Sequence, residues 1–151
     1  MSNARLVLLP LVACALAACE SEAERQADAT EDRIEQEAET SATAAGDAEA
    51  ALGLTERQLL DAELRAADGT ELGDVELVRR DASGAVTGLV VEIEDSDPDR
   101  FVVVPLDGLT TRRDGDDWDL QTTMTTAELA ALPDADMTAG AMSAGTPAAQ
   151  Q

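Results

Sequence analysis

The uneven distribution of large apolar side chains is the feature that most limits how this chain can fold. Leucine, valine, isoleucine and phenylalanine are concentrated in residues 52–133, whereas Ile34 is the only one of them in residues 20–51. A segment without such side chains cannot bury enough surface to offset the entropy that it loses on folding. The sequence therefore predicts a single small hydrophobic core, built from residues after Leu52.

This distribution sets the expected domain boundaries. We predict a leader segment over residues 1–18, a disordered acidic spacer over 19–53, a folded domain over 54–133 and a disordered tail over 134–151. The spacer is rich in Ala and Glu, which favour helix, but it lacks the apolar stripe with which a helix would pack on a domain. We therefore expect it to act as a flexible tether.

Alternation of apolar and polar residues within the predicted domain is typical of short, half-buried β-strands. Turn residues separate the apolar runs, as at Asp68-Gly69 and at residues 81–84. In the second run, the alternation places Val75 and Leu77 on one face. Strands are expected near residues 60–65, 74–78, 89–94, 101–104, 109–112 and 118–121.

The end of the predicted domain has two further local signals. The run Phe101–Val104 is apolar on both faces, which favours a central strand, and Pro105 should end it. Thr125 and Glu128 have the spacing of a capping box, and Pro133 should stop the helix that it opens. The predicted fold class is mainly β, a small β-barrel of five to six strands with a short C-terminal helix and disordered flanks.

The first twenty residues have the pattern of an export signal. Arg5 precedes an uncharged, mostly apolar run over residues 6–18, which is too short to span a bilayer. Residues 16–19 read Leu-Ala-Ala-Cys and resemble the lipobox of bacterial lipoproteins. That resemblance implies that residues 1–18 are a signal peptide cleaved before Cys19, and that the spacer is lipidated on the sulfur of Cys19, its first residue. Cys14 ends a similar motif, but cleavage there would leave a shorter apolar run, so Cys19 is preferred.

Charge and composition exclude several classes of function. The net charge is -22, with 32 acidic residues against 10 basic ones, all of them Arg. Such a surface repels phosphate backbones, so no nucleic-acid partner is expected. The chain has no His and no Lys, and its two cysteines, Cys14 and Cys19, lie near the amino terminus. The common general base and the usual zinc ligands are therefore missing, and we expect neither an enzyme nor a bound cofactor.

The order of motifs in the predicted domain is similar to that of a known family. Residues 68–75 (DGTELGDV) are followed by 81–86 (DASGAV), 89–91 (LVV), 103–106 (VVPL) and the helical segment 125–133. This order resembles the PRC-barrel domain, found in the H subunit of photosynthetic reaction centres and in a ribosome maturation factor. The resemblance covers roughly residues 54–133. It implies a small β-barrel that docks onto other macromolecules without catalysis.

Two acidic segments and three other features are candidate sites. In the loop Glu94–Asp99, the residues Asp95, Asp97 and Asp99 imitate the start of a Ca²⁺-binding EF-hand loop, although Arg100 stands where that loop needs Gly. A solvated acidic turn is the simpler interpretation of this loop. The same holds for the second acidic segment, which contains Asp114, Asp116, Asp117 and Asp119. The other features are Trp118, expected in the core, and the pairs Arg79-Arg80 and Arg112-Arg113, expected in surface ion pairs.

The sequence thus favours a lipid-anchored protein of the cell envelope that faces the periplasm, with the outer membrane favoured over the inner. Its domain is expected to bind an unidentified envelope protein or a second copy of itself, and its only membrane contact is expected to be the lipid. The alternative hypothesis is an envelope protein that binds a divalent cation, or responds to stress, through the acidic loop 94–99.

Overall fold

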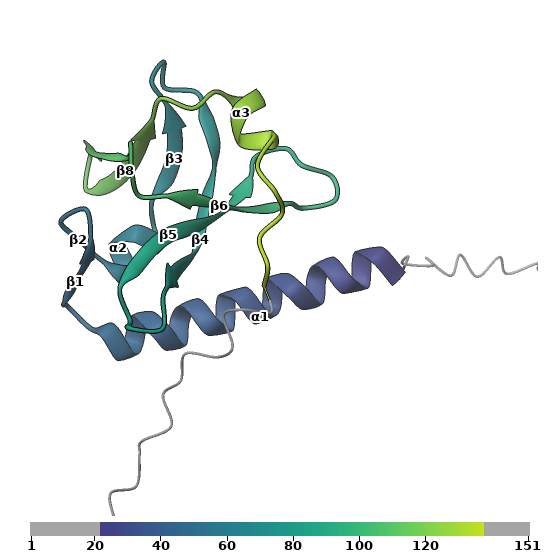
Figure 1. The fold of residues 1–151 in the computed structure, drawn as a ribbon, viewed down its shortest axis with the longest axis horizontal. Helices are drawn as coiled ribbons and strands as arrows, with labels where there is room; N and C mark the ends of the chain where they lie inside the picture. Colours follow the sequence, from purple (N-terminus) through teal and green to yellow (C-terminus); the bar gives the residue numbers. More distant parts are fainter. Residues whose placement is uncertain (1–21, 138–151) are drawn as a thin grey trace, which may run out of the picture.

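One six-stranded sheet dominates the computed structural model, which describes residues 22–137 (Figure 1). The strand order is β6-β5-β4-β3-β8-β7, in which β3 and β8 are parallel and all other neighbours are antiparallel. The predicted fold class, mainly β with a short C-terminal helix, is confirmed. The strands are β3 (Glu63–Ala66), β4 (Glu71–Arg80), β5 (Val86–Ile93), β6 (Phe101–Pro105), β7 (Thr110–Asp114) and β8 (Asp117–Thr122).

The turns and the C-terminal helix follow the local sequence signals. The β3–β4 turn contains Gly69, and in the β4–β5 turn the Asp81 carboxylate accepts hydrogen bonds from the amides of Ser83 and Ala85. Helix α3 (Thr126–Ala130) opens with the predicted capping box, in which Thr125 and Glu128 satisfy each other's backbone amides. The predicted helix start at Thr125 is confirmed.

The first strand begins later than its alternation suggested. Leu60 lies in helix α2 (Glu56–Leu60) and not in a strand, and β3 starts only at Glu63. A second capping box, Thr55 with Gln58, starts this helix and outweighs the period-2 pattern that follows it. A small hairpin, β1 (Glu49–Ala51) with β2 (Leu54–Thr55), precedes the helix, so the folded part begins before residue 54.

The prediction of a disordered spacer was wrong for residues 22–45, which form helix α1 (Glu22–Ala45). The helix lies along one side of the sheet and extends well beyond it at its N-terminal end (Figure 1). Ile34, Ala38 and Ala42 recur every four residues and are all buried. Two of these residues are alanines, whose small side chains let the helix backbone approach the sheet closely. The stripe therefore contains only one of the large apolar residues from which a packing surface is usually predicted.

Residues within α1 favour the helical conformation, and a glycine after its last turn ends it. Ala and Glu, which fill much of α1, have high helix propensity. The Thr30 and Thr40 hydroxyls donate hydrogen bonds to the carbonyls of Gln26 and Gln36, one turn earlier, which satisfies these side chains within the helix without adding to its stability. Gly46 follows the last turn with a φ of 61°, and its amide donates to the Ala42 carbonyl. Glycine adopts this left-handed conformation without strain, so α1 ends there.

The sheet has an apolar surface on both faces. The larger core cluster lies inside the curved sheet and includes Leu64, Leu89, Val91 and Leu120, with Leu129 of α3 packed against them. The smaller cluster lies under α1 and joins its Ile34 and Ala38 to three residues of the sheet, Leu77, Val90 and Phe101. Helix α1 therefore covers the face of the sheet opposite the main core.

A bulge in β4 corrects the expectation that Val75 and Leu77 share a face. Val75 pairs with Val91 and Leu77 with Val90, so Glu76 is the extra residue of an irregular pairing. Because Val90 and Val91 point to opposite faces of β5, their partners do so as well. Val75 accordingly belongs to the main cluster, and Leu77 to the cluster under α1.

The prediction that Phe101–Val104 forms a central strand was also wrong, because β6 lies at one end of the sheet. Its two apolar faces have another cause. Val102 and Val104 face the main cluster, while Phe101 and Val103 contact the cluster under α1. The chain beyond α3 returns along this edge, where Asp134 forms a bridge with Val102 and the Ala135 amide donates to the Phe101 carbonyl. The start of the predicted tail is therefore part of the fold.

Several predictions concern residues that the structure does not describe. Cys19, Cys14 and the signal peptide all lie within residues 1–21, and most of the predicted tail lies within residues 138–151. Among the helices of residues 22–137, none is both long enough and apolar enough to cross a membrane.

Candidate functional site

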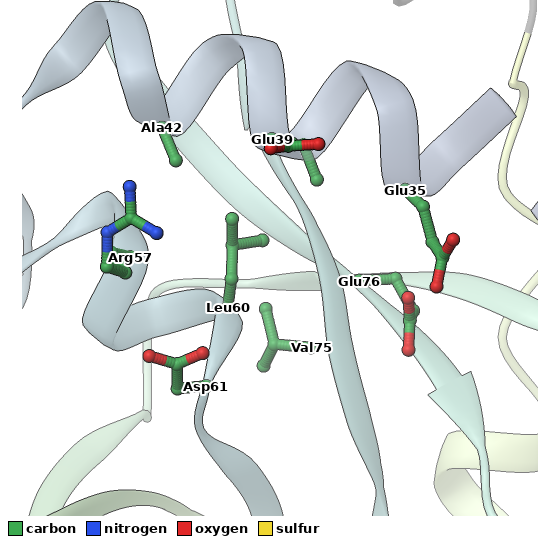
Figure 2. Close-up of a pocket in the computed structure, with 9 residues that line it drawn as sticks. Glu35, Glu39, Ala42, Arg57, Leu60, Asp61, Val75 and Glu76 are labelled. Atoms are coloured by element: carbon green, nitrogen blue, oxygen red, sulfur yellow. The ribbon is translucent and has the colours of Figure 1, made fainter. Parts of the chain in front are cut away.

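A groove lies where α1 passes over α2 and β4, and it encloses about 370 Å³ (Figure 2). Its floor is apolar and is formed by Ala38, Ala42, Leu60 and Val75. Charged side chains line its rim. They come from all three elements and are Glu35 and Glu39 of α1, Arg57 of α2, Asp61 at the end of α2, and Glu76 of β4.

The bulge residue Glu76 is the most perturbed acid of this groove. Its side chain is half-buried, and Figure 2 shows it facing Glu35 across the helix–sheet junction. Burial raises the pKa of Glu76 to about 7, and the neighbouring carboxylates Glu92, Asp74, Glu31 and Glu35 add to the shift. Within residues 22–137, Glu76 takes part in no salt bridge.

The acidic loop predicted from the sequence lines a second pocket, of about 290 Å³. Glu94, Asp95, Ser96 and Asp99 of the loop contribute to it, whereas Asp97 does not. The sheet completes the pocket with Asp74 of β4 and with Glu92 and Ile93 of β5. The structure thus brings four of the loop residues together with two carboxylates from strands.

Crowding of negative charge is also evident in this second pocket. Burial is the main cause of the raised pKa of Glu92, and the charge of Asp99 is the next largest contribution. The hydroxyl of Ser96 is already used, because it donates to the Ile93 carbonyl and accepts from the Arg100 amide. The carboxylates are therefore the groups in this pocket that remain available to a cation.

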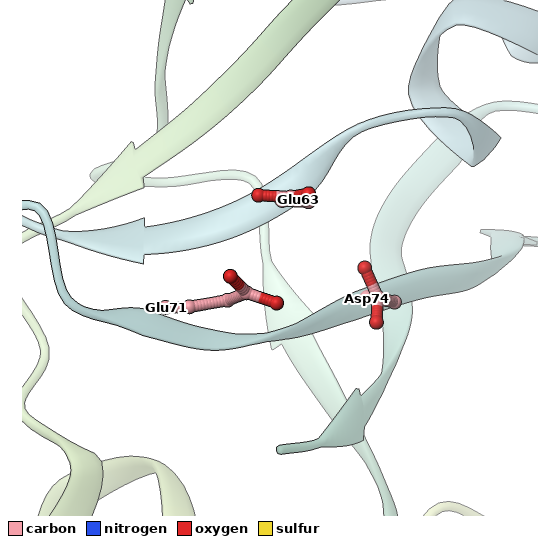
Figure 3. A group of neighbouring side chains, drawn as sticks. All are labelled: Glu63, Glu71 and Asp74. Carbon is pink, nitrogen blue, oxygen red and sulfur yellow. The ribbon is translucent and has the colours of Figure 1, made fainter.

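A third group of acids spans the neighbouring strands β3 and β4 (Figure 3). Carboxylate oxygens of Glu63, Glu71 and Asp74 lie within 4.8 Å of one another, and no other acidic group in residues 22–137 is as tight. The charge of Glu63 is the main cause of the raised pKa of Glu71. However, the Arg65 guanidinium contacts Glu63 directly and lies 3.6 Å from Glu71, so part of this charge is already balanced.

The second acidic segment does not assemble into a site. Asp114 and Asp117 pair at the β7–β8 hairpin, and Asp116 is exposed at its tip. Asp119 is buried at a distance from the tip, with its Oδ2 atom 3.4 Å from Nε of Arg65. The four residues therefore belong to two different environments.

The aromatic and basic candidates are also separate from one another. Trp118 is half-buried against the main core, and the Arg113 guanidinium stacks 4.8 Å from the centre of its ring. Arg79 donates to the Asp136 carbonyl, and Arg80 pairs with Glu56. Strands β3 and β8 separate the two arginine pairs in the sheet, so they form no joint basic patch.

The ion pair between Glu56 and Arg80 was not expected from the sequence. The Glu56 side chain is fully buried, and its Oε2 atom accepts a hydrogen bond of 2.7 Å from Arg80. Its other oxygen is buried without a hydrogen-bond partner. The pair joins the start of α2 to the end of β4, and we regard its role as structural.

The acids that complete the two pockets were missed by sequence reasoning. Period-2 alternation would place Asp74, Glu76 and Glu92 on the solvent-facing side of their strands, and Glu35 and Glu39 lie within the segment predicted to be a disordered spacer. No local sequence pattern predicts that these residues lie close together, because strand pairing and helix docking bring them together. The spacing of Ile34, Ala38 and Ala42 was the one available hint.

No protein-family model matches the chain, and no curated protein is significantly similar to it.

Proposed function

We propose that this chain is a lipid-anchored protein of the bacterial cell envelope, facing the periplasm, whose β-domain binds another protein without catalysis. The outer membrane is favoured over the inner. The lipobox-like residues 16–19 support the anchor, and the resemblance of residues 54–133 to the PRC-barrel domain supports the binding role. The absence of His and Lys from the sequence supports a non-catalytic domain.

The observation that carries this proposal is the docking of α1 onto the sheet. The helix begins at Glu22, three residues after Cys19, and Ile34 is its first residue described as buried. A helix rises about 1.5 Å per residue, so the part before Ile34 spans roughly 18 Å. A lipid on Cys19 would therefore hold the domain through a helical stalk at a limited distance from the membrane and restrict the orientation of the domain.

The anchor is tested by its chemistry. Mass spectrometry of the mature amino terminus should find acylated Cys19, and the protein should fractionate with membranes. Cys19→Ser should abolish both the lipid and the membrane fractionation, whereas Cys14→Ser should change neither. Membrane fractionation that survives Cys19→Ser would refute the anchor.

The binding role is tested by cross-linking in intact cells. A photoreactive amino acid is placed in turn at Glu39 on the groove rim, at Asp95 in the acidic loop and at the exposed Asp116 of the hairpin. We expect a discrete cross-linked product from at least one of the three positions and no product from at least one other. Absence of any product, or the same diffuse pattern from all three positions, would contradict a specific partner.

A second function, binding of a divalent cation, is favoured by the pocket that the loop 94–99 forms with Asp74 and Glu92. Ca²⁺ prefers several oxygen ligands, and carboxylates are the main ones that this pocket offers. Calorimetric titration with Ca²⁺ should then show saturable heat that Glu92→Gln removes and Asp116→Asn preserves. No heat at millimolar Ca²⁺ would exclude this function.

A further inference from the structure

The groove between α1, α2 and β4 combines an apolar surface with a charged one. Its floor of Ala38, Ala42, Leu60 and Val75 is apolar, while Glu35, Glu39, Asp61 and Glu76 carry carboxylates on its rim. A small inorganic cation would gain nothing from the floor. A Lys or Arg side chain would gain from both, because its aliphatic stem packs on apolar surface while its charged end reaches the rim.

Glu76 is placed in this groove by the β4 bulge. Bulges redirect a side chain away from the ordinary alternation of a strand, and here the extra residue faces α1. The carboxylate is partly desolvated and takes part in no salt bridge within residues 22–137. A cation bound beside it would favour the charged form of Glu76, whose negative charge no salt bridge of the described residues balances.

The rest of the described chain offers little positive charge to this groove. Arg57 is the only basic residue that lines it, and the chain contains no Lys. A second copy of the protein is a poor occupant, because two chains of charge -22 repel each other. Charge complementarity therefore favours a basic segment of a different protein.

We propose that the groove between α1, α2 and β4 is a docking site for a Lys- or Arg-containing segment of a partner protein. One basic side chain lies on Leu60, with its charge between Glu35 and Glu76. This inference rests on the proposed binding role of the domain and specifies the chemistry of the partner. Helix α1 forms one wall of the groove, so the anchor and the docking site share the same element.

The test measures binding of a short peptide to the full chain in nonionic detergent. The probe is a capped nonapeptide of sequence Gly-Arg-Ser repeated three times, and the matched control peptide carries neutral citrulline in place of each Arg. Calorimetry should detect binding of the Arg peptide only. Glu76→Gln and Glu35→Gln should each weaken that binding about fivefold to tenfold.

Matched variants separate a site from general attraction to an acidic protein. Asp114→Asn and Asp116→Asn remove the same charge from the distant hairpin and should change affinity less than twofold. Leu60→Asn should also weaken binding, because it removes part of the apolar floor. Equal weakening by the hairpin and groove variants, or no binding of the Arg peptide, would overturn the proposal.

The pH dependence of binding gives an independent measure. The charged groups around Glu76 are Glu31 and Glu35 on α1 and Asp74 and Glu92 on the sheet, with Arg57 and Asp61 on the rim. Because Glu76 loses its proton near pH 7, affinity for the Arg peptide should rise between pH 6 and pH 8. The rise should be absent in Glu76→Gln, and a variant that keeps it would contradict the role of Glu76.

Failure of this inference can be distinguished from failure of the proposed function. If specific cellular cross-links persist while the groove variants bind the peptide as the wild type does, the partner docks elsewhere and only the groove assignment is wrong. If neither cross-links nor peptide binding are found, the binding role itself is refuted.

Discussion

Gly73 shows how a single residue can be fixed by the close approach of two strands. It lies in β4 opposite Ile93 with a φ of 155°, and a Cβ atom built there would be 1.8 Å from the Glu92 carbonyl oxygen. This glycine belongs to the DGTELGDV segment on which the family resemblance partly depends. The turn glycine Gly84 also has a positive φ, of 87°, but has open space around it.

We predict that Gly73→Ala destabilises the domain by more than about 3 kcal/mol, because the backbone must shift to relieve the contact with Glu92. Gly84→Ala carries only the cost of its left-handed conformation, about 1–2 kcal/mol. Urea denaturation of both variants measures the difference. Similar losses for the two variants would show that the strands can separate easily at Gly73.

The buried carboxylate of Glu56 gives a second prediction at the residue scale. Arg80 is its only ion-pair partner among the described residues, and one of its oxygens already lacks a hydrogen bond. Arg80→Met should destabilise the fold by about 3 kcal/mol, because it leaves a buried charge without compensation. Arg79→Met removes the same charge next to it and should cost less than about 1 kcal/mol in the same denaturation assay.

At the scale of elements, α1 depends on a narrow contact. Its buried stripe contains one large side chain, Ile34, and two alanines, Ala38 and Ala42. The helix and the sheet are both negatively charged at this contact, since Glu31 and Glu35 of α1 face Glu76 of β4. Helix α1 should therefore be the least stable large element, able to undock while the sheet stays folded.

Ile34→Ala should weaken the docking of α1 by about 2 kcal/mol or more, because it removes most of the large apolar contact. Hydrogen exchange should then become about 30-fold faster for amides of α1, while β4 and β5 keep their protection. Ala44→Ser, at an exposed position of the helix, should leave exchange nearly unchanged. Equal loss of protection in the sheet would show that the helix and the sheet unfold as one unit.

At the scale of the whole molecule, negative charge dominates the response to pH. Burial and the charge of neighbouring carboxylates raise the pKa values of Glu76 and Glu92, and the charge of Glu63 is the main cause of the raised pKa of Glu71. Between pH 4.5 and about 7, folded Glu76 retains a proton that the unfolded chain has already lost. Stability contributed by this group is therefore complete at low pH and is lost as the pH rises through 7.

Glu76→Gln should remove this dependence. Allowing for solvent screening of a half-buried group, we expect the variant to be about 1–2 kcal/mol more stable than the wild type at pH 8. The two proteins should be nearly equal at pH 4.5. Thermal or urea denaturation at both pH values measures the effect, with Asp116→Asn as the exposed control. A difference that does not change with pH would contradict the raised pKa.

The same variant links stability to the proposed docking site. Glu76→Gln is expected to lose affinity for a basic peptide while gaining stability at pH 8. Loss of binding in an unfolded variant says nothing about a docking site. Loss of binding in a variant that is more stable than the wild type identifies the side chain as part of the site. It would indicate that Glu76 is retained for binding at a cost to the fold.

Local patterns of the sequence were enough to predict the β-rich class, most of the strands, the turns at Gly69 and Asp81, and the capping box of α3. Each depends on residues close in the chain, through side-chain alternation, turn geometry or a side chain that satisfies a nearby amide. The capping box of α2 is equally local, but the period-2 alternation that follows it in the sequence favours a strand at the same place. The lipid anchor at Cys19 also depends on local pattern, and it stays a prediction.

Only the tertiary structure decided where α1 packs, which face each residue of β4 occupies and which acids meet. The Ala-rich stripe of α1 is a packing surface because the sheet lies against it, and the sequence of the helix alone does not indicate that partner. The bulge at Glu76 arises from pairing with β5, and Asp74 and Glu92 join the loop 94–99 because their strands are neighbours. These features depend on contacts between residues far apart in the sequence, which no local pattern contains.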